Sequence, residues 1–147
     1  MKMKKLICVM ALVCIGMLLV SCGSKRLDNP KAQFIRDFGL HIDKKDCVLE
    51  ELFNNYEGFP YEGMALYKLT VGEDVRQAFL QWERIPFSKE AEHFLESLST
   101  YVELPSIADG YWKMVDRNPG TSAYTNVSLC VYDEATGIEY LLIMDKL

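Results

Sequence analysis

His41 and Cys47 are the two residues of this sequence whose types and spacing could support nucleophilic chemistry. His41 precedes Asp43 and lies six positions before Cys47, and a histidine beside a thiol can accept its proton and activate it for attack. The competing interpretation makes His41 a surface loop residue and Cys47 a strand residue packed in the core. We favour the second interpretation and assign no catalytic residue.

Carboxylates are the second source of chemistry. They gather at Glu50-Glu51, at Glu90, Glu92 and Glu96, and at Asp133-Glu134. A glycosidase needs two carboxylates that face one cleft, and the order of residues does not reveal such a pair. The segment 133–137 lacks the spacing of an EF-hand loop, and the chain contains no GxSxG or HExxH motif. We therefore expect no metal and no cofactor.

The N-terminus carries the signature of export. Lys2, Lys4 and Lys5 precede an uncharged, largely apolar stretch from 6 to 20, which is the pattern of a cleaved signal. At about 15 residues this stretch is shorter than the roughly 20 that a membrane-spanning helix needs.

The stretch ends in Leu19-Val20-Ser21-Cys22, which resembles the lipobox of bacterial lipoproteins. The resemblance implies that the Cys22 thiol receives a diacylglyceryl group and that a peptidase cuts before it. We therefore predict a signal peptide over 1–21, a lipidated tether over 22–29 and one domain over 30–147. Two acyl chains on one residue give stable anchoring. The predicted location is the extracytoplasmic face of the cell membrane, or the outer membrane if the host has one.

Processing at Cys22 leaves few cysteines. Cys8 and Cys14 lie in the signal, so that only Cys47 and Cys130 remain unmodified. In an exported protein these two could form a disulfide, or both could be buried thiols that act as small hydrophobic side chains. We favour buried thiols, because both residues have apolar neighbours.

The net charge of the processed chain argues against nucleic acid as a partner. The signal contains three of the 16 Lys and Arg residues and none of the 21 Asp and Glu residues, so the processed chain has a net charge of −8. An acidic domain without a basic stripe argues against binding to nucleic acid. The membrane, reached through the lipid on Cys22, and an envelope protein are the partners that we expect.

The segment 56–63 is the most unusual part of the predicted domain. It contains Tyr-Glu-Gly twice, around Phe59 and Pro60, and Pro60 stiffens it. Rigid aromatic residues provide contact area at a low cost in entropy, so Tyr56, Phe59 and Tyr61 form a candidate interaction loop. The alternative is a hairpin loop in which Phe59 folds back over the core.

The same segment carries a resemblance. Gly58-Phe59 with Glu62-Gly63, leading into an aromatic strand, resembles a loop in a family of small uncharacterised bacterial proteins, many of them lipoproteins. In that family the loop typically reads His-Gly-Gly-Phe-His-Gly-Asp-Gly between two strands, and two central helices and a closing hairpin follow. The resemblance implies a strand–loop–strand here and brings no activity with it. Tyr56 and Pro60 stand where the family has its two histidines, so histidine chemistry does not carry over.

Helices are predicted at three places. Asn29 and Pro30 are typical of a helix start and Gly39 of a helix end, which gives a helix over 30–38. Apolar residues at helical spacing indicate two further helices. Their apolar faces are Val75, Ala78, Phe79 and Trp82, and then Ala91, Phe94, Leu95 and Leu98.

The remaining elements are predicted as strands. Residues 64–71, 111–116, 127–132 and 138–144 fit strands, whereas the segment 47–56 fits either a helix or a strand. The run Leu141-Leu142-Ile143-Met144 is apolar on both faces, which is typical of a central or covered strand. We therefore predict an α+β domain, in which an antiparallel sheet has the two central helices packed on one face and a short N-terminal helix before it.

The expected function follows from the predicted export signal, the predicted lipid anchor and the net negative charge of the processed chain. We expect a membrane-anchored extracytoplasmic lipoprotein that acts as a non-enzymatic binding or interaction module. The alternative is a small envelope hydrolase that uses carboxylates.

Overall fold

The computed structural model describes residues 29–57, 62–120 and 125–146. These ranges form an antiparallel sheet with the strand order β1-β2-β6-β5-β4-β3 and three α-helices, which confirms the predicted α+β class. The strands are β1 (Cys47–Asn54), β2 (Gly63–Val71), β3 (Glu83–Arg84), β4 (Gly110–Asp116), β5 (Asn126–Asp133) and β6 (Ile138–Asp145). The helices are α2 (Pro30–Phe38), α3 (Glu73–Phe79) and α4 (Lys89–Ser99), and a 3-10 turn, η1 (Lys44–Asp46), precedes β1.

Helix α2 has the bounds that its sequence predicts. The Asn29 side chain accepts a hydrogen bond from the backbone N–H of Ala32 at 2.9 Å, which satisfies one of the free donors at the helix start. Pro30 occupies the first helical position, where a missing N–H costs nothing. Gly39 ends the helix with a positive φ of 65°, a conformation that glycine adopts without strain.

The two central helices also form, with different lengths. Ser88 caps α4 by accepting a hydrogen bond from the backbone N–H of Ala91 at 3.2 Å. Helix α3 ends at Phe79, so Trp82 lies beyond it instead of on its predicted apolar face. The Trp82 ring still packs on Phe79, with 4.5 Å between ring centroids.

The segment 47–56, which fits two periodicities, is a strand for most of its length. Its residues 47–54 pair with β2 in antiparallel register, from Cys47 opposite Val71 to Asn54 opposite Ala65. The register shifts between Glu51 and Phe53, as at a β-bulge. Because β2 follows β1 closely in the chain, this pairing favours the strand.

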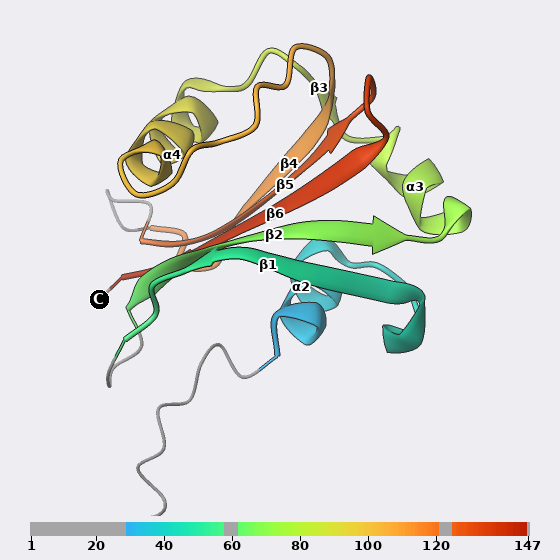
Figure 1. The fold of residues 1–147 in the computed structure, drawn as a ribbon, viewed down its shortest axis with the longest axis horizontal. Helices are drawn as coiled ribbons and strands as arrows, with labels where there is room; N and C mark the ends of the chain where they lie inside the picture. The colour runs from blue at the N-terminus through green and yellow to red at the C-terminus, as the bar shows by residue number, and fades with distance from the viewer. Residues whose placement is uncertain (1–28, 58–61, 121–124, 147) are drawn as a thin grey trace, which may run out of the picture.

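Helices cover both faces of the sheet. Side chains alternate between the two faces along each strand, and both faces carry apolar side chains that need a cover. On one face α2 and α3 pack on a core that includes Phe34, Phe79 and Ile143. On the other face α4 packs on a core that includes Phe94 and Leu142. Figure 1 shows α4 and α2 on opposite sides of the sheet.

The placement of the helices therefore differs from the expectation in one respect. The two central helices were expected on the same face, but α3 and α4 lie on opposite faces, and α2 is the helix that shares a face with α3. The central position of β6 between β2 and β5 explains the difference. Its residues 141–144 are buried on both faces, so each face needs a cover.

Within the described ranges, no helix is both long and apolar enough to cross a membrane.

Candidate functional site

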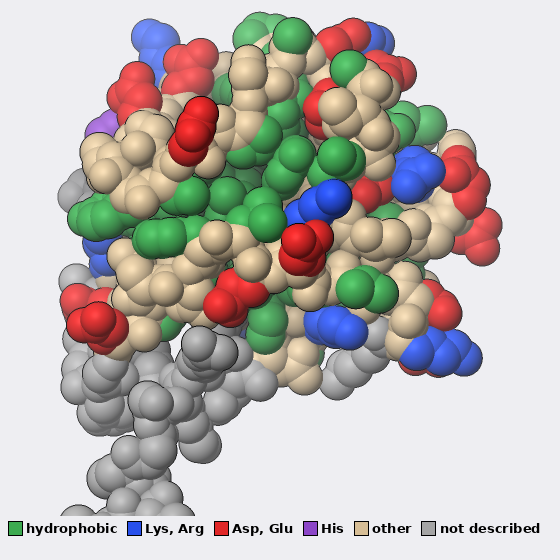
Figure 2. Space-filling view, viewed as in Figure 1, with side chains coloured by type: hydrophobic (Ala, Val, Ile, Leu, Met, Phe, Trp, Pro, Cys, Tyr) green, Lys and Arg blue, Asp and Glu red, His purple; other side chains and the backbone are tan. Residues whose placement is uncertain are grey.

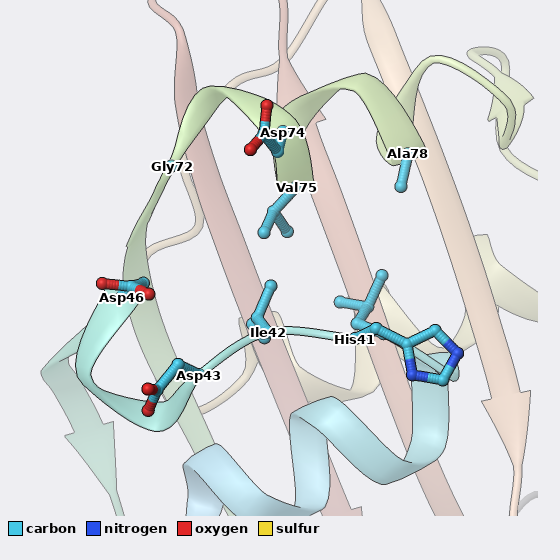
Figure 3. Close-up of a pocket in the computed structure, with 9 residues that line it drawn as sticks. His41, Ile42, Asp43, Asp46, Gly72, Asp74, Val75 and Ala78 are labelled. Atoms are coloured by element: carbon cyan, nitrogen blue, oxygen red, sulfur yellow. The ribbon is translucent and has the colours of Figure 1, made fainter.

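A cleft of about 390 Å³ lies on the face covered by α2 and α3. One wall comes from the segment that connects α2 to β1, and the other comes from α3 (Figure 3). Its volume falls within the range of small-molecule sites. The lining residues are Leu40, His41, Ile42, Asp43, Asp46, Gly72, Asp74, Val75 and Ala78.

Local signals in the sequence shape the first wall. The left-handed Gly39 ends α2 and turns the chain, so that residues 40–43 run across the face of the sheet. The Asp43 side chain then accepts a hydrogen bond from the backbone N–H of Lys45 at 3.3 Å and starts the 3-10 turn. That turn ends at Asp46, directly before the buried Cys47 begins β1.

The interior of the cleft is apolar and its rim is acidic. Ile42 and Val75 point toward each other from the two walls, with Ala78 beside them (Figure 3). The exposed carboxylates of Asp43, Asp46 and Asp74 line the same cleft, and among the described residues no Lys or Arg lines it. Asp43 Oδ2 is paired with Lys45 Nζ at 3.2 Å, so Asp46 and Asp74 are the carboxylates that remain for a ligand. Such an arrangement suits a ligand with a cationic head and an apolar stem, because the stem leaves water while the head pairs with carboxylates.

His41 and Cys47 do not form a nucleophilic pair. The His41 ring points away from the centre of the cleft (Figure 3) and His41 is exposed, whereas Cys47 is fully buried. Burial raises the pKa of the Cys47 thiol, and it raises that of Cys130 well above the usual value. Because the thiolate is the nucleophile, both residues are inert side chains of the core.

Both thiols are free, and the sheet topology keeps them apart. Cys47 and Cys130 are each fully buried. They belong to β1 and β5, which β2 and β6 separate in the sheet. At about 4.8 Å per strand this separation is much larger than the roughly 7 Å limit on Cα atoms joined by a disulfide.

The carboxylate of Glu139 is a buried acid of the cleft-bearing face, and it already has a partner. Arg76 Nε donates to Glu139 Oε1 at 3.1 Å. Burial nevertheless raises the pKa of Glu139, although Arg76 acts in the opposite direction. Glu139 does not line the cleft, so its role is to attach α3 to the sheet.

The candidate interaction loop is only partly within the described residues. Tyr56 is half-buried, and its hydroxyl donates to Asp145 Oδ2 at 2.8 Å. Burial and the adjacent Asp145 carboxylate raise the pKa of Tyr56, which keeps its hydroxyl a donor. Tyr56 therefore braces the end of β6, whereas Phe59 and Tyr61 lie outside the described residues.

Two further sequence predictions concern lipidation and metal binding. Cys22, the predicted lipidation site, lies outside the described residues. In the ranges that the structure describes, no three His, Cys, Asp or Glu side chains form a group suited to a metal ion.

Sequence reasoning did not single out the cleft. Asp46 and Asp74 carry no motif, and they lie 28 positions apart. The available signals were local: Asp43 before a short turn, and Asp74 in the first turn of an amphipathic helix. Neither signal indicates that the two segments meet.

Comparisons with protein-family models, curated proteins and solved structures found no match. The resemblance noted from the loop at 56–63 thus stays a prediction.

Proposed function

We propose that this chain is a lipid-anchored extracytoplasmic binding module whose cleft between the 40–46 segment and α3 takes a cationic ligand with an apolar stem. The cleft carries this proposal: Ile42 and Val75 face each other inside it, and Asp46 and Asp74 supply negative charge at its rim. Anchoring rests on the lipobox at 19–22, and the net negative charge of the processed chain adds long-range attraction for a cation.

The geometry gives binding more support than hydrolysis. A carboxylate that acts as a general acid in hydrolysis needs a raised pKa within reach of substrate. Glu139 has a raised pKa, but it is paired with Arg76 and lies outside the cleft. The carboxylates of the cleft are exposed, which suits pairing with a cation.

Replacing Cys22 by alanine is expected to abolish incorporation of labelled fatty acid, since the thiol that receives the lipid is gone. The protein should then stay unprocessed or leave the membrane fraction. Metabolic labelling with membrane fractionation measures both effects, and Cys14→Ala is the matched control because Cys14 lies within the predicted signal. Labelling that persists in the Cys22 variant would exclude the anchor.

Neutralising the rim of the cleft is expected to weaken the binding of cationic probes. For Asp46→Asn/Asp74→Asn we expect 1,4-diaminobutane or arginine methyl ester to bind about tenfold more weakly, which corresponds to roughly 1.4 kcal/mol. The affinity of the unsubstituted protein should also fall as salt is added, because exposed charges are screened. Titration calorimetry on the detergent-solubilised full chain measures both effects.

Glu92→Gln/Glu96→Gln is the matched control for the cleft. It removes the same amount of charge from exposed positions on α4, on the opposite face of the sheet. Binding should be unchanged in this control, and the stability of both variants should stay within about 0.5 kcal/mol of the parent. Equal losses in the two variants would show that only net charge attracts the probe, and the cleft would be rejected.

A further inference from the structure

The two edges of the sheet differ in how far they are open to another strand. One edge is β3, which contains only Glu83 and Arg84. The other is β1, which is eight residues long. Proteins protect their edges by shortening them, by charges and by bulges. The β3 edge is short and charged, whereas β1 is long and has one bulge and two adjacent glutamates.

The outer side of β1 is free of partners among the described residues. An edge strand directs alternate backbone N–H and C=O groups away from its sheet. No hydrogen bond within the described ranges reaches the backbone of 48–53 from outside the β1–β2 ladder. Figure 1 shows β1 along the border of the sheet, in front of α2, and the same view in Figure 2 has acidic side chains at the surface along this border.

Apolar side chains are exposed on the same strand. Val48 is 57% exposed and Leu52 is 46% exposed. Within the described ranges four large hydrophobic side chains are at least 36% exposed, and two of them lie on β1. Free backbone groups with exposed apolar side chains are the features that a strand-adding partner uses, the backbone for affinity and the side chains for specificity.

The charges on β1 indicate which kind of strand can pair with this edge. The exposed Glu50 and Glu51 stand at the middle of β1. In a symmetric antiparallel pair of two copies, each of the three central registers places a glutamate directly opposite a glutamate of the other copy, which is destabilising. A partner strand with basic residues at its middle would instead form opposite-charge pairs.

We propose that the β1 edge is a strand-addition site for an extended segment of a partner protein that has two adjacent basic residues flanked by β-branched ones. The partner strand extends the sheet beyond β1, its backbone pairs with the outer groups of 47–54, and its basic residues face Glu50 and Glu51. This site is separate from the ligand cleft, so it holds or fails independently of the cleft.

The test uses the detergent-solubilised full chain and three synthetic peptides. The first is Thr-Val-Val-Lys-Lys-Val-Val-Thr, the second has Glu-Glu in place of Lys-Lys, and the third has two of the valines of the first replaced by proline, which cannot donate a backbone hydrogen bond. We measure the dissociation constant, and amide hydrogen exchange at the residues of β1. The lysine peptide should bind and slow exchange in β1, and the other two should bind at least about tenfold more weakly.

Two variants of the protein test whether the peptide contacts β1. Glu50→Lys/Glu51→Lys should weaken binding of the lysine peptide by at least about tenfold. Glu92→Lys/Glu96→Lys, which makes the same change of charge at exposed positions of α4, should leave binding unchanged. Asp46→Asn/Asp74→Asn in the cleft should also retain it, so that failure of this site is distinguishable from failure of the cleft.

Several results would overturn the proposal. They are absence of binding, equal binding of the proline peptide, and binding that leaves exchange in β1 unchanged. An equal loss in the α4 variant would reduce the effect to net charge. A dimer of the full chain in sedimentation that the β1 variant dissociates would identify a second copy as the occupant instead.

Discussion

Replacing Gly110 by alanine is expected to destabilise the protein by about 4 kcal/mol or more, at the upper end of single substitutions. Gly110 begins β4 opposite Asp133 of β5, with a φ of 154° that side chains rarely adopt. A Cβ atom there would overlap the backbone carbonyl oxygen of Tyr132 and lie 3.3 Å from the backbone nitrogen of Glu134. Because these neighbours are backbone atoms, no change of rotamer relieves the overlap, and β4 must separate from β5. Denaturant unfolding followed by circular dichroism measures the loss.

Gly72→Ala is the control for Gly110. A Cβ at Gly72 meets nothing within 4 Å, and its φ of −67° suits any residue. We expect a change within about 1 kcal/mol, because the main effect is on the entropy of the unfolded chain. If Gly110→Ala is no more destabilising than Gly72→Ala, the close approach of β4 to β5 is wrong.

Replacing Arg117 by methionine is expected to cost about 3–5 kcal/mol, the range found when one partner of a buried ion pair is removed. The guanidinium forms an ion pair with Asp145 Oδ1 at 2.8 Å and donates to the carbonyl of Met144 at 2.9 Å, and its Nε lies 3.5 Å from Asp37 Oδ2. The side chain of Asp37 is 4% exposed and that of Asp145 is 18% exposed. Methionine keeps the length of the side chain but leaves Asp145 without its cation, and it leaves Asp37 with only the exposed Arg36, whose Nε lies 3.2 Å from Asp37 Oδ1.

Arg84→Met is the matched control for Arg117. Arg84 also bridges two carboxylates, those of Asp109 and Glu134, but its side chain is 57% exposed. Surface ion pairs contribute about 0–1 kcal/mol, so a small change is expected. Similar losses in the two variants, measured by the same unfolding experiment, would contradict the view that Arg117 holds α2 and β6 together.

The position of Arg117 illustrates contacts that no local pattern reveals. Asp37 also accepts a hydrogen bond from the hydroxyl of Ser128 at 2.8 Å across 91 positions of the chain, and Tyr56 reaches Asp145 across 89. In the sequence Tyr56 belonged to an aromatic loop that suggested recognition. In the structure its hydroxyl donates a hydrogen bond to Asp145. The residue type of Tyr56 was therefore informative, but the sequence did not indicate its hydrogen-bond partner.

Helix ends are where the sequence was most informative. The bounds of α2 follow from Asn29, Pro30 and Gly39, because capping joins atoms within three or four residues of each other. Gly137, in the hairpin between β5 and β6, has a φ of 68°, a left-handed conformation that glycine adopts without strain. Such features depend on the residue and its neighbours alone, so they can be predicted without knowledge of the fold.

The strand β1 and the cleft depended on distant partners. The apolar spacing of 47–56 fitted two periods equally, and pairing with β2 selected the strand. The cleft exists because the β1–β2 hairpin returns the chain beside its own start, which brings Gly72 and Asp74 to the segment 40–46. Residue order gives no distance between such segments, so Asp46 and Asp74 could not be paired from the sequence.

By itself the sequence determined the fold class, the bounds of α2 and a last strand that is central or covered, since each follows from short-range capping or from the apolarity of one strand. The tertiary structure alone decided that α3 and α4 cover opposite faces. Amphipathic spacing shows that a helix buries one side, but a sheet whose central strand is apolar on both faces offers two surfaces of similar hydrophobicity. The path of the chain between the helices, through the β3 edge, then decides which surface each helix covers.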